Sequence, residues 1–249
     1  MSHRTYPPPA SPPALHMTWH MLLFMHWRTP ADALRQRIPA RLSIDTFDGS
    51  AWIAIVPFHM RHVYPSLAPV DVPKLSAFVE LNVRTYVTLD GQPGVWFFSL
   101  DAESKIAVRV ARRLFHLPYM DAEMRCELLP QPNSRSLGEE VNYTSHRTHE
   151  GAPAAELAVR YQPCGPTFAA APGSLEDFLT ARYCLYSADP HGNLYRGEID
   201  HAPWPLQPAK CEIACNTMTE QIGVALPNQP PHLLFAHQLD VVAWPLQKC

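Results

Sequence analysis

The segment SAFVELNVRTYVTLDGQPGVWFFSL, residues 76–100, decides the fold of this chain. Residues 76–89 and 94–100 are rich in β-branched and aromatic side chains, which favour strands. DGQPG stands between them, and an Asp-Gly pair readily adopts the positive φ angles of a tight hairpin turn. The segment therefore predicts two antiparallel strands joined by a short turn.

Segments of the same character lie on both sides of this hairpin. The chain contains 27 Pro and 10 Gly, a composition that disfavours a helical bundle and favours strands separated by turns. Many strands with few helices predict a mainly β protein (α+β), built as an antiparallel barrel or a strongly bent pair of sheets. The other strands are expected at 17–26, 51–63, 119–129, 139–148, 155–162, 193–201, 209–218 and 233–244.

Short helices are expected between some of these strands. Each candidate helix begins near a residue whose side chain can accept a hydrogen bond from the first turn. The helices are expected within 28–39, 101–115 and 172–186, with candidate N-caps Thr29, Asp101 or Ser104, and Ser174.

The chain is expected to form one domain. Its 249 residues are enough for a substantial core, and neither a linker nor an internal repeat divides them. Residues 1–16 include YPPPASPPALH and predict a flexible proline-rich tail, which leaves 17–249 as a single domain. The polar segment NSRSLGE (133–139) predicts a loop between strands.

Charge and cysteine content exclude several classes of protein. A net charge of −3 gives no electrostatic signature of binding to nucleic acid or to an anionic membrane. The apolar run at 17–27 is too short to span a bilayer and precedes no signal-peptide cleavage site. Six cysteines without a CxxC pair suggest a reducing compartment. We therefore expect a cytoplasmic protein with neither a nucleic-acid nor a membrane partner.

One strand carries an unusual set of polar residues. Strand alternation places Glu80, Asn82, Arg84 and Tyr86 on one face of 78–87. This face either meets water or lines a cavity, and the sequence leaves both interpretations open. An acid, an amide, a guanidinium and a phenol favour the cavity, because solvated strand faces are usually rich in Lys, Thr and Ser.

The segment RRLFHLPYMDAEM, residues 112–124, forms a corner at Pro118 between a predicted helix and a predicted strand. Acidic side chains recur at two-residue steps beyond the corner, and they repel one another unless they are solvated or paired. The outer part of this strand is therefore expected at the surface. Only Tyr119 or Met120, next to the proline, is well placed for a site.

Other candidate residues have both a functional and a structural interpretation. Arg182 could hold a ligand carboxylate or cap the carbonyls of the helix before it. His201, in HAPWPL, could act near a cavity or brace the Pro-Trp-Pro turn. The 13 histidines match no metal-ligand spacing, and there is no glycine-rich phosphate loop. No metal or cofactor is therefore expected.

Several segments, taken in order, resemble the YqjF-like family of conserved bacterial proteins, also described as domain of unknown function 2071. The resemblance spans roughly residues 17–246. The family is similar in turn to the acetoacetate decarboxylase superfamily. It implies a cone-shaped antiparallel β-barrel with a few flanking helices and an internal active site. The segments are HWRTPADALRQRIPARLSIDTFDGSAWIAIVPF (26–58), FVELNVRTYV (78–87), PGVWFFSLDA (93–102), ARRLFHLPY (111–119), FLTARYCLY (178–186) and HAPWPL (201–206).

Acetoacetate decarboxylases carry a strand glutamate, an arginine beyond the next hairpin, and a Pro-Lys-Lys corner whose lysine forms a Schiff base with the substrate ketone. By resemblance, Glu80 falls on the glutamate, Arg112 on the arginine and Pro118 on the corner proline. Tyr119 and Met120 then stand where the lysines would be. A phenol or a thioether cannot form an imine, so standard decarboxylation through this corner is not expected.

These residues predict an internal pocket that binds or transforms a small keto or carboxylic acid without a Schiff base. Lyase-, isomerase- or hydratase-like chemistry and simple binding both fit. A structural or partner-binding domain is an alternative, and a lyase with its amine relocated to Lys210 is another, since Lys74 and Lys105 are expected in solvent. Barrels of this superfamily often associate, so a homo-oligomer is compatible with the resemblance. The predicted catalytic residues are Glu80, Arg112 and Tyr119, and the predicted ligand-binding residues are Asn82, Arg84, Tyr86, Arg182 and His201.

Overall fold

The hairpin at 76–100 is present in the computed structural model of the chain. β4 (Phe78–Leu89) pairs antiparallel with β5 (Gln92–Ala102). Asp90 and Gly91 form the turn with φ angles of 50° and 79°, the left-handed region that a two-residue hairpin loop requires. The Asp-Gly signal therefore predicted the turn correctly.

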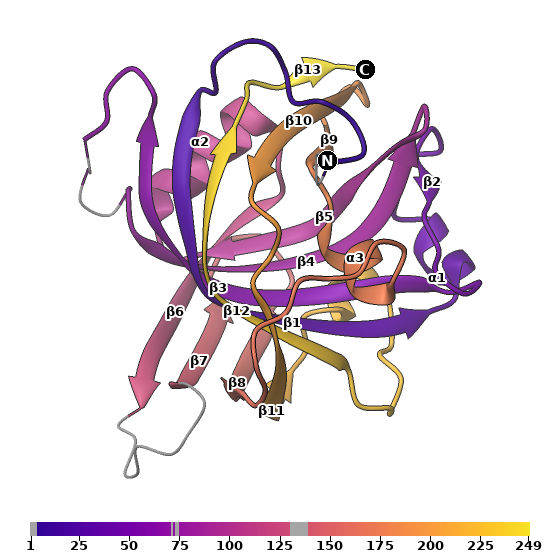
Figure 1. Cartoon of the computed structure of the whole chain (residues 1–249), viewed down its shortest axis with the longest axis vertical. Helices are drawn as coiled ribbons and strands as arrows, with labels where there is room; N and C mark the ends of the chain where they lie inside the picture. Colours follow the sequence, from indigo (N-terminus) through magenta and orange to yellow (C-terminus); the bar gives the residue numbers. More distant parts are fainter. Residues whose placement is uncertain (1–3, 71, 73–74, 130–138) are drawn as a thin grey trace.

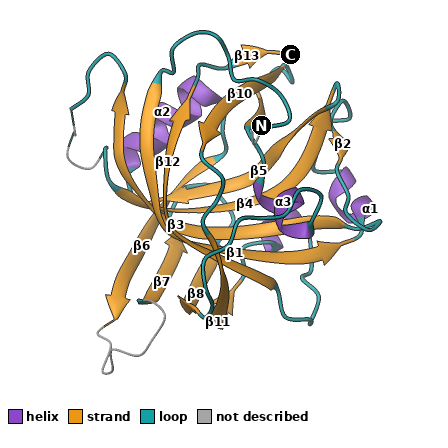
Figure 2. Ribbon diagram, viewed as in Figure 1, coloured by secondary structure: helices purple, strands orange, loops and turns teal. Residues whose placement is uncertain are grey.

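The structure describes residues 4–70, 72, 75–129 and 139–249, so most of the predicted loop at 133–139 lies outside the described residues (Figure 1). Strands predominate over helices (Figure 2). Within these ranges, no helix has the length and apolar character needed to cross a bilayer.

The helices are α1 (Ala31–Arg35), α2 (Lys105–Phe115), α3 (Leu175–Thr180) and a 3-10 turn (Glu220–Ile222). The other strands are β1 (Leu15–Thr29), β2 (Ser43–Ile44), β3 (Ala51–Pro65), β6 (Tyr119–Leu129), β7 (Glu140–Arg147), β8 (Glu156–Pro163), β9 (Cys184–Ala188), β10 (Leu194–His201), β11 (Leu206–Asn216), β12 (His232–Ala243) and β13 (Gln247–Lys248).

Nine strands close into a barrel. The circuit of hydrogen-bonded neighbours runs β5-β6-β7-β8-β11-β12-β1-β3-β4 and returns to β5. All pairings in this circuit are antiparallel except that of β5 with β6, between which α2 carries the chain back along the sheet. The prediction of a mainly β barrel with a few helices is confirmed.

A second, smaller circuit shares part of the barrel wall. β9 pairs with both β5 and β10, and β10 also pairs with β12, which closes a ring through β1, β3 and β4. The shared wall therefore separates two cores. On β3, for example, Ile53 and Ile55 belong to one core, whereas Ala54, Val56 and Phe58 belong to the other. A strand in this wall is buried on both faces.

Helix α2 and its ends place the start of β6 beside β5. Ser104 caps the helix through its side chain, as predicted, whereas the alternative cap Asp101 belongs to β5. The helix ends at His116, whose φ of 48° lies in the left-handed region. The chain then runs parallel to β5, with Tyr119 opposite Leu100.

The other two predicted caps had different outcomes. Ser174 accepts a hydrogen bond from the backbone N–H of Asp177 at 3.2 Å, which confirms it as the N-cap of α3. Thr29 as the N-cap of α1 is wrong, because Thr29 ends β1 and Pro30 takes the cap position without a side-chain hydrogen bond. Pairing of Thr29 with Ala51 on β3 holds it in the sheet.

The residues before β1 lie against the barrel. Arg4 is buried, and its guanidinium contacts the carboxylates of Glu198 at 3.2 Å and Asp200 at 2.9 Å on β10. The sequence predicted a flexible tail over 1–16, whereas the structure attaches its described part to β10 and begins β1 at Leu15.

A buried ion pair joins β5 to β7. Arg147 Nη2 lies 2.6 Å from Asp101 Oδ1, and both side chains are at most 1% exposed. Arg147 also donates hydrogen bonds to Ser99 and Gln221. The Asp101 carboxylate is thus compensated chiefly by Arg147, and loss of that partner leaves a charge in the core.

We expect Arg147→Met to lower the free energy of unfolding by about 3–5 kcal/mol, because it leaves the Asp101 carboxylate buried without a counter-charge. Urea denaturation followed by circular dichroism measures this change. Glu212→Gln is the matched control, since it removes a carboxylate from an exposed 4.0 Å contact with Arg160. The control should change stability by less than about 1 kcal/mol. Similar effects of the two substitutions would contradict a central role for the buried pair.

Candidate functional site

The polar face of β4 lies inside the fold. Glu80 and Asn82 are 2% and 5% exposed, Tyr86 is fully buried, and Arg84 keeps partial exposure. The interpretation in which this face meets bulk water is therefore wrong for Glu80, Asn82 and Tyr86. Across the β3–β4 pair, the residues opposite Glu80, Asn82 and Arg84 are the core residues Phe58, Val56 and Ala54.

Glu80 and Tyr119 are in direct contact at one end of this face. Tyr119 Oη donates a hydrogen bond to Glu80 Oε2 at 2.9 Å, and both side chains are buried. In the β4–β5 pair, Glu80 lies opposite Ala102. In the parallel β5–β6 pair, Tyr119 lies opposite Leu100, two residues earlier on the same strand. Strand register therefore brings together two residues that the chain separates by 39 positions.

Burial changes the protonation of this pair. Removal from water raises the pKa of Glu80 from 4.5 to about 8, and the hydrogen bond from Tyr119 offsets only part of the rise. Burial and the nearby Glu80 carboxyl raise the pKa of Tyr119 well above 10.0. At neutral pH the pair is therefore mainly a protonated carboxyl group beside a neutral phenol. Because Tyr119 gives its O–H to Glu80, the carboxyl O–H of Glu80 is the neutral donor that can stabilise an oxygen atom as it gains negative charge.

Asn82 and Arg84 continue the face beyond Glu80. Within the described residues, Asn82 Oδ1 and Arg84 Nε are buried atoms without a hydrogen-bond partner. The Arg84 guanidinium lies over the rings of Phe24 and Tyr86, 5.6 and 5.9 Å from their centroids, and pairs with no carboxylate in the described part of the chain. A guanidinium in these surroundings is available to an anionic ligand.

Tyr86 is the last residue on the polar face of β4, and it makes a contact that the sequence analysis missed. Its hydroxyl lies 2.8 Å from Nε2 of His26 on β1. Burial, together with Arg84 and His232, holds the pKa of His26 well below 6.5, so its ring is neutral at pH 7. The available signal was a histidine within an apolar strand, on the same face as Phe24.

Arg112 lies outside this buried cluster, and its predicted catalytic role stays a prediction. Its side chain is exposed and donates a hydrogen bond to the backbone carbonyl of Tyr119 at 2.6 Å. Arg112 thereby fixes the first residue of β6.

Two predicted ligand-binding residues have structural partners. Arg182 contacts the Asp45 carboxylate at 2.6 Å and donates to the carbonyl of Phe178 in α3 at 2.7 Å. His201 packs its ring against Trp204, with 5.1 Å between centroids. These contacts match the structural alternatives, in which Arg182 caps α3 and His201 braces the Pro-Trp-Pro turn.

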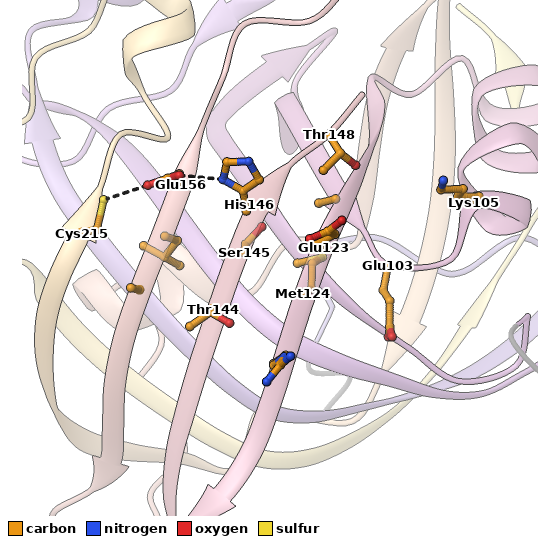
Figure 3. A pocket seen from close by; sticks show the side chains of 14 residues that line it. Glu103, Lys105, Glu123, Met124, Thr144, Ser145, His146, Thr148, Glu156 and Cys215 are labelled. Carbon is orange, nitrogen blue, oxygen red and sulfur yellow. Dashed lines mark hydrogen bonds and ion pairs between the residues drawn. The ribbon is translucent and has the colours of Figure 1, made fainter. Parts of the chain in front are cut away.

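A cleft of about 620 Å³ lies elsewhere, lined mainly by residues of β6, β7 and β8 (Figure 3). Glu156 stands between His146 and Cys215 there and contacts both, at 2.6 Å from Nδ1 and 3.8 Å from Sγ. None of the predicted site residues lines this cleft. Among the described residues, no group of three or more His, Cys, Asp or Glu has the arrangement of a metal site. A second cavity, of about 310 Å³, is lined by His26 and Trp52.

Comparison with known sequences places the chain in a family. The family described as an uncharacterized conserved protein, domain of unknown function 2071, matches residues 16–240. The chain belongs to this family. The uncharacterized protein YqjF of Bacillus subtilis (strain 168) is 41% identical over 234 residues, which cover 94% of this chain and 92% of YqjF. The family resemblance predicted from the ordered sequence segments is confirmed.

Solved structures share the fold of this member of the domain of unknown function 2071 family at low identity. The enduracididine biosynthesis enzyme MppR, complexed with pyruvate, has a TM-score of 0.65 at 13% identity, over 96% of this chain and 91% of MppR. An acetoacetate decarboxylase-like enzyme from Sphingomonas wittichii RW1 has a TM-score of 0.63 at 14% identity, over 99% and 98% of the two chains. The acetoacetate decarboxylase-like fold predicted from the sequence is confirmed.

Lysine is absent from the buried residues that the structure describes. Lys210 is exposed on β11, and Lys105 is exposed at the start of α2. Lys74 lies outside the described residues. In this family member, the position after Pro118 holds Tyr119, whose phenol contacts Glu80.

We expect Glu80 to make the protein less stable as pH rises from about 4.5 to about 8. The folded chain keeps this proton up to about pH 8, whereas the unfolded chain releases it near pH 4.5, so the unfolded state binds fewer protons in this window. Glu80→Gln removes the titrating group. The wild type should therefore lose stability relative to Glu80→Gln by about 1.4 kcal/mol per pH unit.

Urea denaturation of the two proteins across this pH range measures the difference. Tyr119→Phe is the companion variant, since loss of its hydrogen bond should raise the pKa of Glu80 further and extend the window upward. Parallel pH profiles for the wild type and Glu80→Gln would show that burial does not shift this carboxyl group.

Proposed function

We propose that this protein binds a small keto acid inside the fold and polarises its carbonyl group without forming a Schiff base. The observation that carries the proposal is the buried Tyr119–Glu80 contact at the corner where the resemblance to acetoacetate decarboxylases implies a lysine. MppR, a protein of similar fold, was solved with pyruvate, which supports this ligand class by analogy.

Arg84 is suited to the carboxylate of such a ligand. Arg84 lies four positions beyond Glu80 on the same strand face, so their Cα atoms are roughly 13 Å apart. The long arginine side chain spans part of this distance, and a keto acid of a few carbon atoms spans the rest. Asn82 lies between them with an unpartnered buried oxygen within the described residues. It can accept a hydrogen bond from a hydroxyl group of a ligand.

Glu80 and Tyr119 are suited to the ketone. Glu80 retains its proton at neutral pH and can donate a hydrogen bond to the carbonyl oxygen. Tyr119 holds the other carboxyl oxygen and so orients the group. Charge that develops on the carbonyl oxygen is then stabilised by a neutral donor in a buried site. Enolisation, hydration and carbon–carbon cleavage all begin with this polarisation.

We expect Arg84→Met to weaken the binding of pyruvate or a longer 2-keto acid at least tenfold, because the methionine keeps the apolar contacts and loses the charge–charge hydrogen bonds. Isothermal titration calorimetry on the full-length protein measures this, with circular dichroism as a check of folding. Lys210→Ala is the control and should bind like the wild type. If the wild type bound no keto acid, or if Arg84→Met bound equally well, the proposal would be wrong.

Borohydride reduction in the presence of pyruvate distinguishes this chemistry from that of an amine. We expect no covalent adduct on the wild type by intact-protein mass spectrometry, because the structure describes no lysine inside the fold. Tyr119→Lys should gain an adduct, since it places an amine beside Glu80 at the corner. A wild-type adduct that disappears in Lys210→Ala would instead support the relocated lysine.

A further inference from the structure

The cavity of about 310 Å³ is lined by residues of β1 and β3 and by the proline-rich segment before β12. It combines aromatic rings, one cation and a proline-rich rim. A cavity of this size accommodates a small organic molecule. Its lining residues include Arg28, His26, Trp52, His232, Pro230 and Pro231.

Strand register connects this cavity with Arg84. Arg28 lies opposite Trp52 in the β1–β3 pair, and His26 lies opposite Ala54. Ala54 in turn lies opposite Arg84 in the β3–β4 pair. Directly opposed residues point to the same face of a sheet, so the cavity residues and Arg84 share one face of the wall. His26, which lines the cavity, contacts Tyr86 on the polar face of β4 and so links the cavity to that face.

Arg28 supplies positive charge at the cavity. Its guanidinium carbon lies over the ring of Trp52, 5.0 Å from the centroid, and the side chain is exposed. No carboxylate pairs with Arg28 in the described ranges. A guanidinium stacked on an indole keeps its in-plane N–H groups available, and these match the two oxygens of a carboxylate.

Trp52 supplies a second donor. Its side chain is 3% exposed, yet Nε1 has no hydrogen-bond partner among the residues that the structure describes. An indole N–H can only donate, and a buried donor without an acceptor costs about 1–3 kcal/mol. An acceptor brought by a ligand would remove this cost.

The other ionisable groups at the cavity do not add a competing positive charge. Burial lowers the pKa of His232, and the nearby Glu176 opposes this effect. The Glu176 carboxylate lies 3.4 Å from Nε2 of His232, which has no hydrogen-bond partner among the described residues. The pKa of His26 is also lowered by burial. Arg28 therefore provides the positive charge that a ligand meets in the cavity.

We propose that this cavity is a second binding position, selective for small carboxylic acids with a flat apolar body, in which Arg28 and the Trp52 indole N–H hold the carboxylate and the proline rim holds the body. It rests on the proposed function only in sharing its ligand class, a small carboxylic acid. It differs in position and in residues, since it uses β1 and β3 rather than Glu80, Arg84 and Tyr119. It also offers a docking position on the sheet face that leads to Arg84.

Indole N–H signals in a ¹H–¹⁵N correlation spectrum of the full-length protein test this position directly. The chain has six tryptophans, and Trp52→Phe identifies the Trp52 signal by its absence. Titration with benzoate should shift the Trp52 signal downfield as the N–H gains an acceptor. Benzyl alcohol, which has the same ring without the carboxylate, should not produce this shift.

Substitutions separate the residues that carry the interaction. Arg28→Met should weaken benzoate binding at least tenfold, and Trp52→Phe should weaken it several-fold while keeping an aromatic ring in the core. Lys210→Ala should bind benzoate like the wild type. An unchanged benzoate affinity in Arg28→Met, or a Trp52 signal that does not respond to benzoate, would overturn the inference even if Trp52→Phe failed to fold.

The outcome is independent of the interior site. Arg84→Met leaves Arg28 and Trp52 in place, so benzoate should still shift the Trp52 signal in that variant. Pyruvate binding that depends on Arg84, combined with no effect of benzoate at Trp52, would retain the proposed function and reject the second position. Benzoate binding that depends on Arg28, without any keto-acid binding at Arg84, would do the reverse.

Discussion

Burial of β4 on both faces is the constraint on which the rest of the structure depends. The strands around it belong to two closed circuits at once, so Glu80, Asn82 and Tyr86 are shut off from bulk water and need a partner inside the fold. Glu80 meets this requirement by retaining its proton and binding Tyr119, and Tyr86 meets it through His26. Arg84 keeps a buried donor without a partner in the described residues, and the proposed ligand would supply that partner.

The crossover from β5 through α2 to β6 decides which residue meets Glu80. Parallel strands need a connection long enough to return along the sheet, and α2 provides it before the corner at Pro118. The first residue after the corner then enters the core. In acetoacetate decarboxylases, the resemblance implies an amine there, whereas here Tyr119 keeps a hydrogen-bond donor and removes the nucleophile. The carbonyl site that we propose therefore differs in its chemistry from a Schiff-base site in the same fold.

Local signals in the sequence predicted the turn at Asp90 and the caps at Ser104 and Ser174, because each depends on only a few neighbouring residues. Thr29 carried an equally good capping signal, but pairing between strands kept it in β1. For Arg182 the sequence left a ligand role and a helix-capping role open, and the fold supplied Asp45, which lies 137 positions away in the chain. His26 was overlooked for the same reason, since its partner Tyr86 is 60 positions away.

The sequence by itself determined the strands, the hairpin, the polar alternation of Glu80, Asn82, Arg84 and Tyr86, and the replacement of an amine by Tyr119. Only the tertiary structure decided that this polar face is enclosed, that Glu80 keeps its proton, and that Arg112 lies outside. The physical reason is the range of the forces involved. Backbone conformation and alternation depend on residues a few positions apart, whereas solvent exclusion and the pKa of a carboxyl group depend on strands that meet only after the barrel has closed.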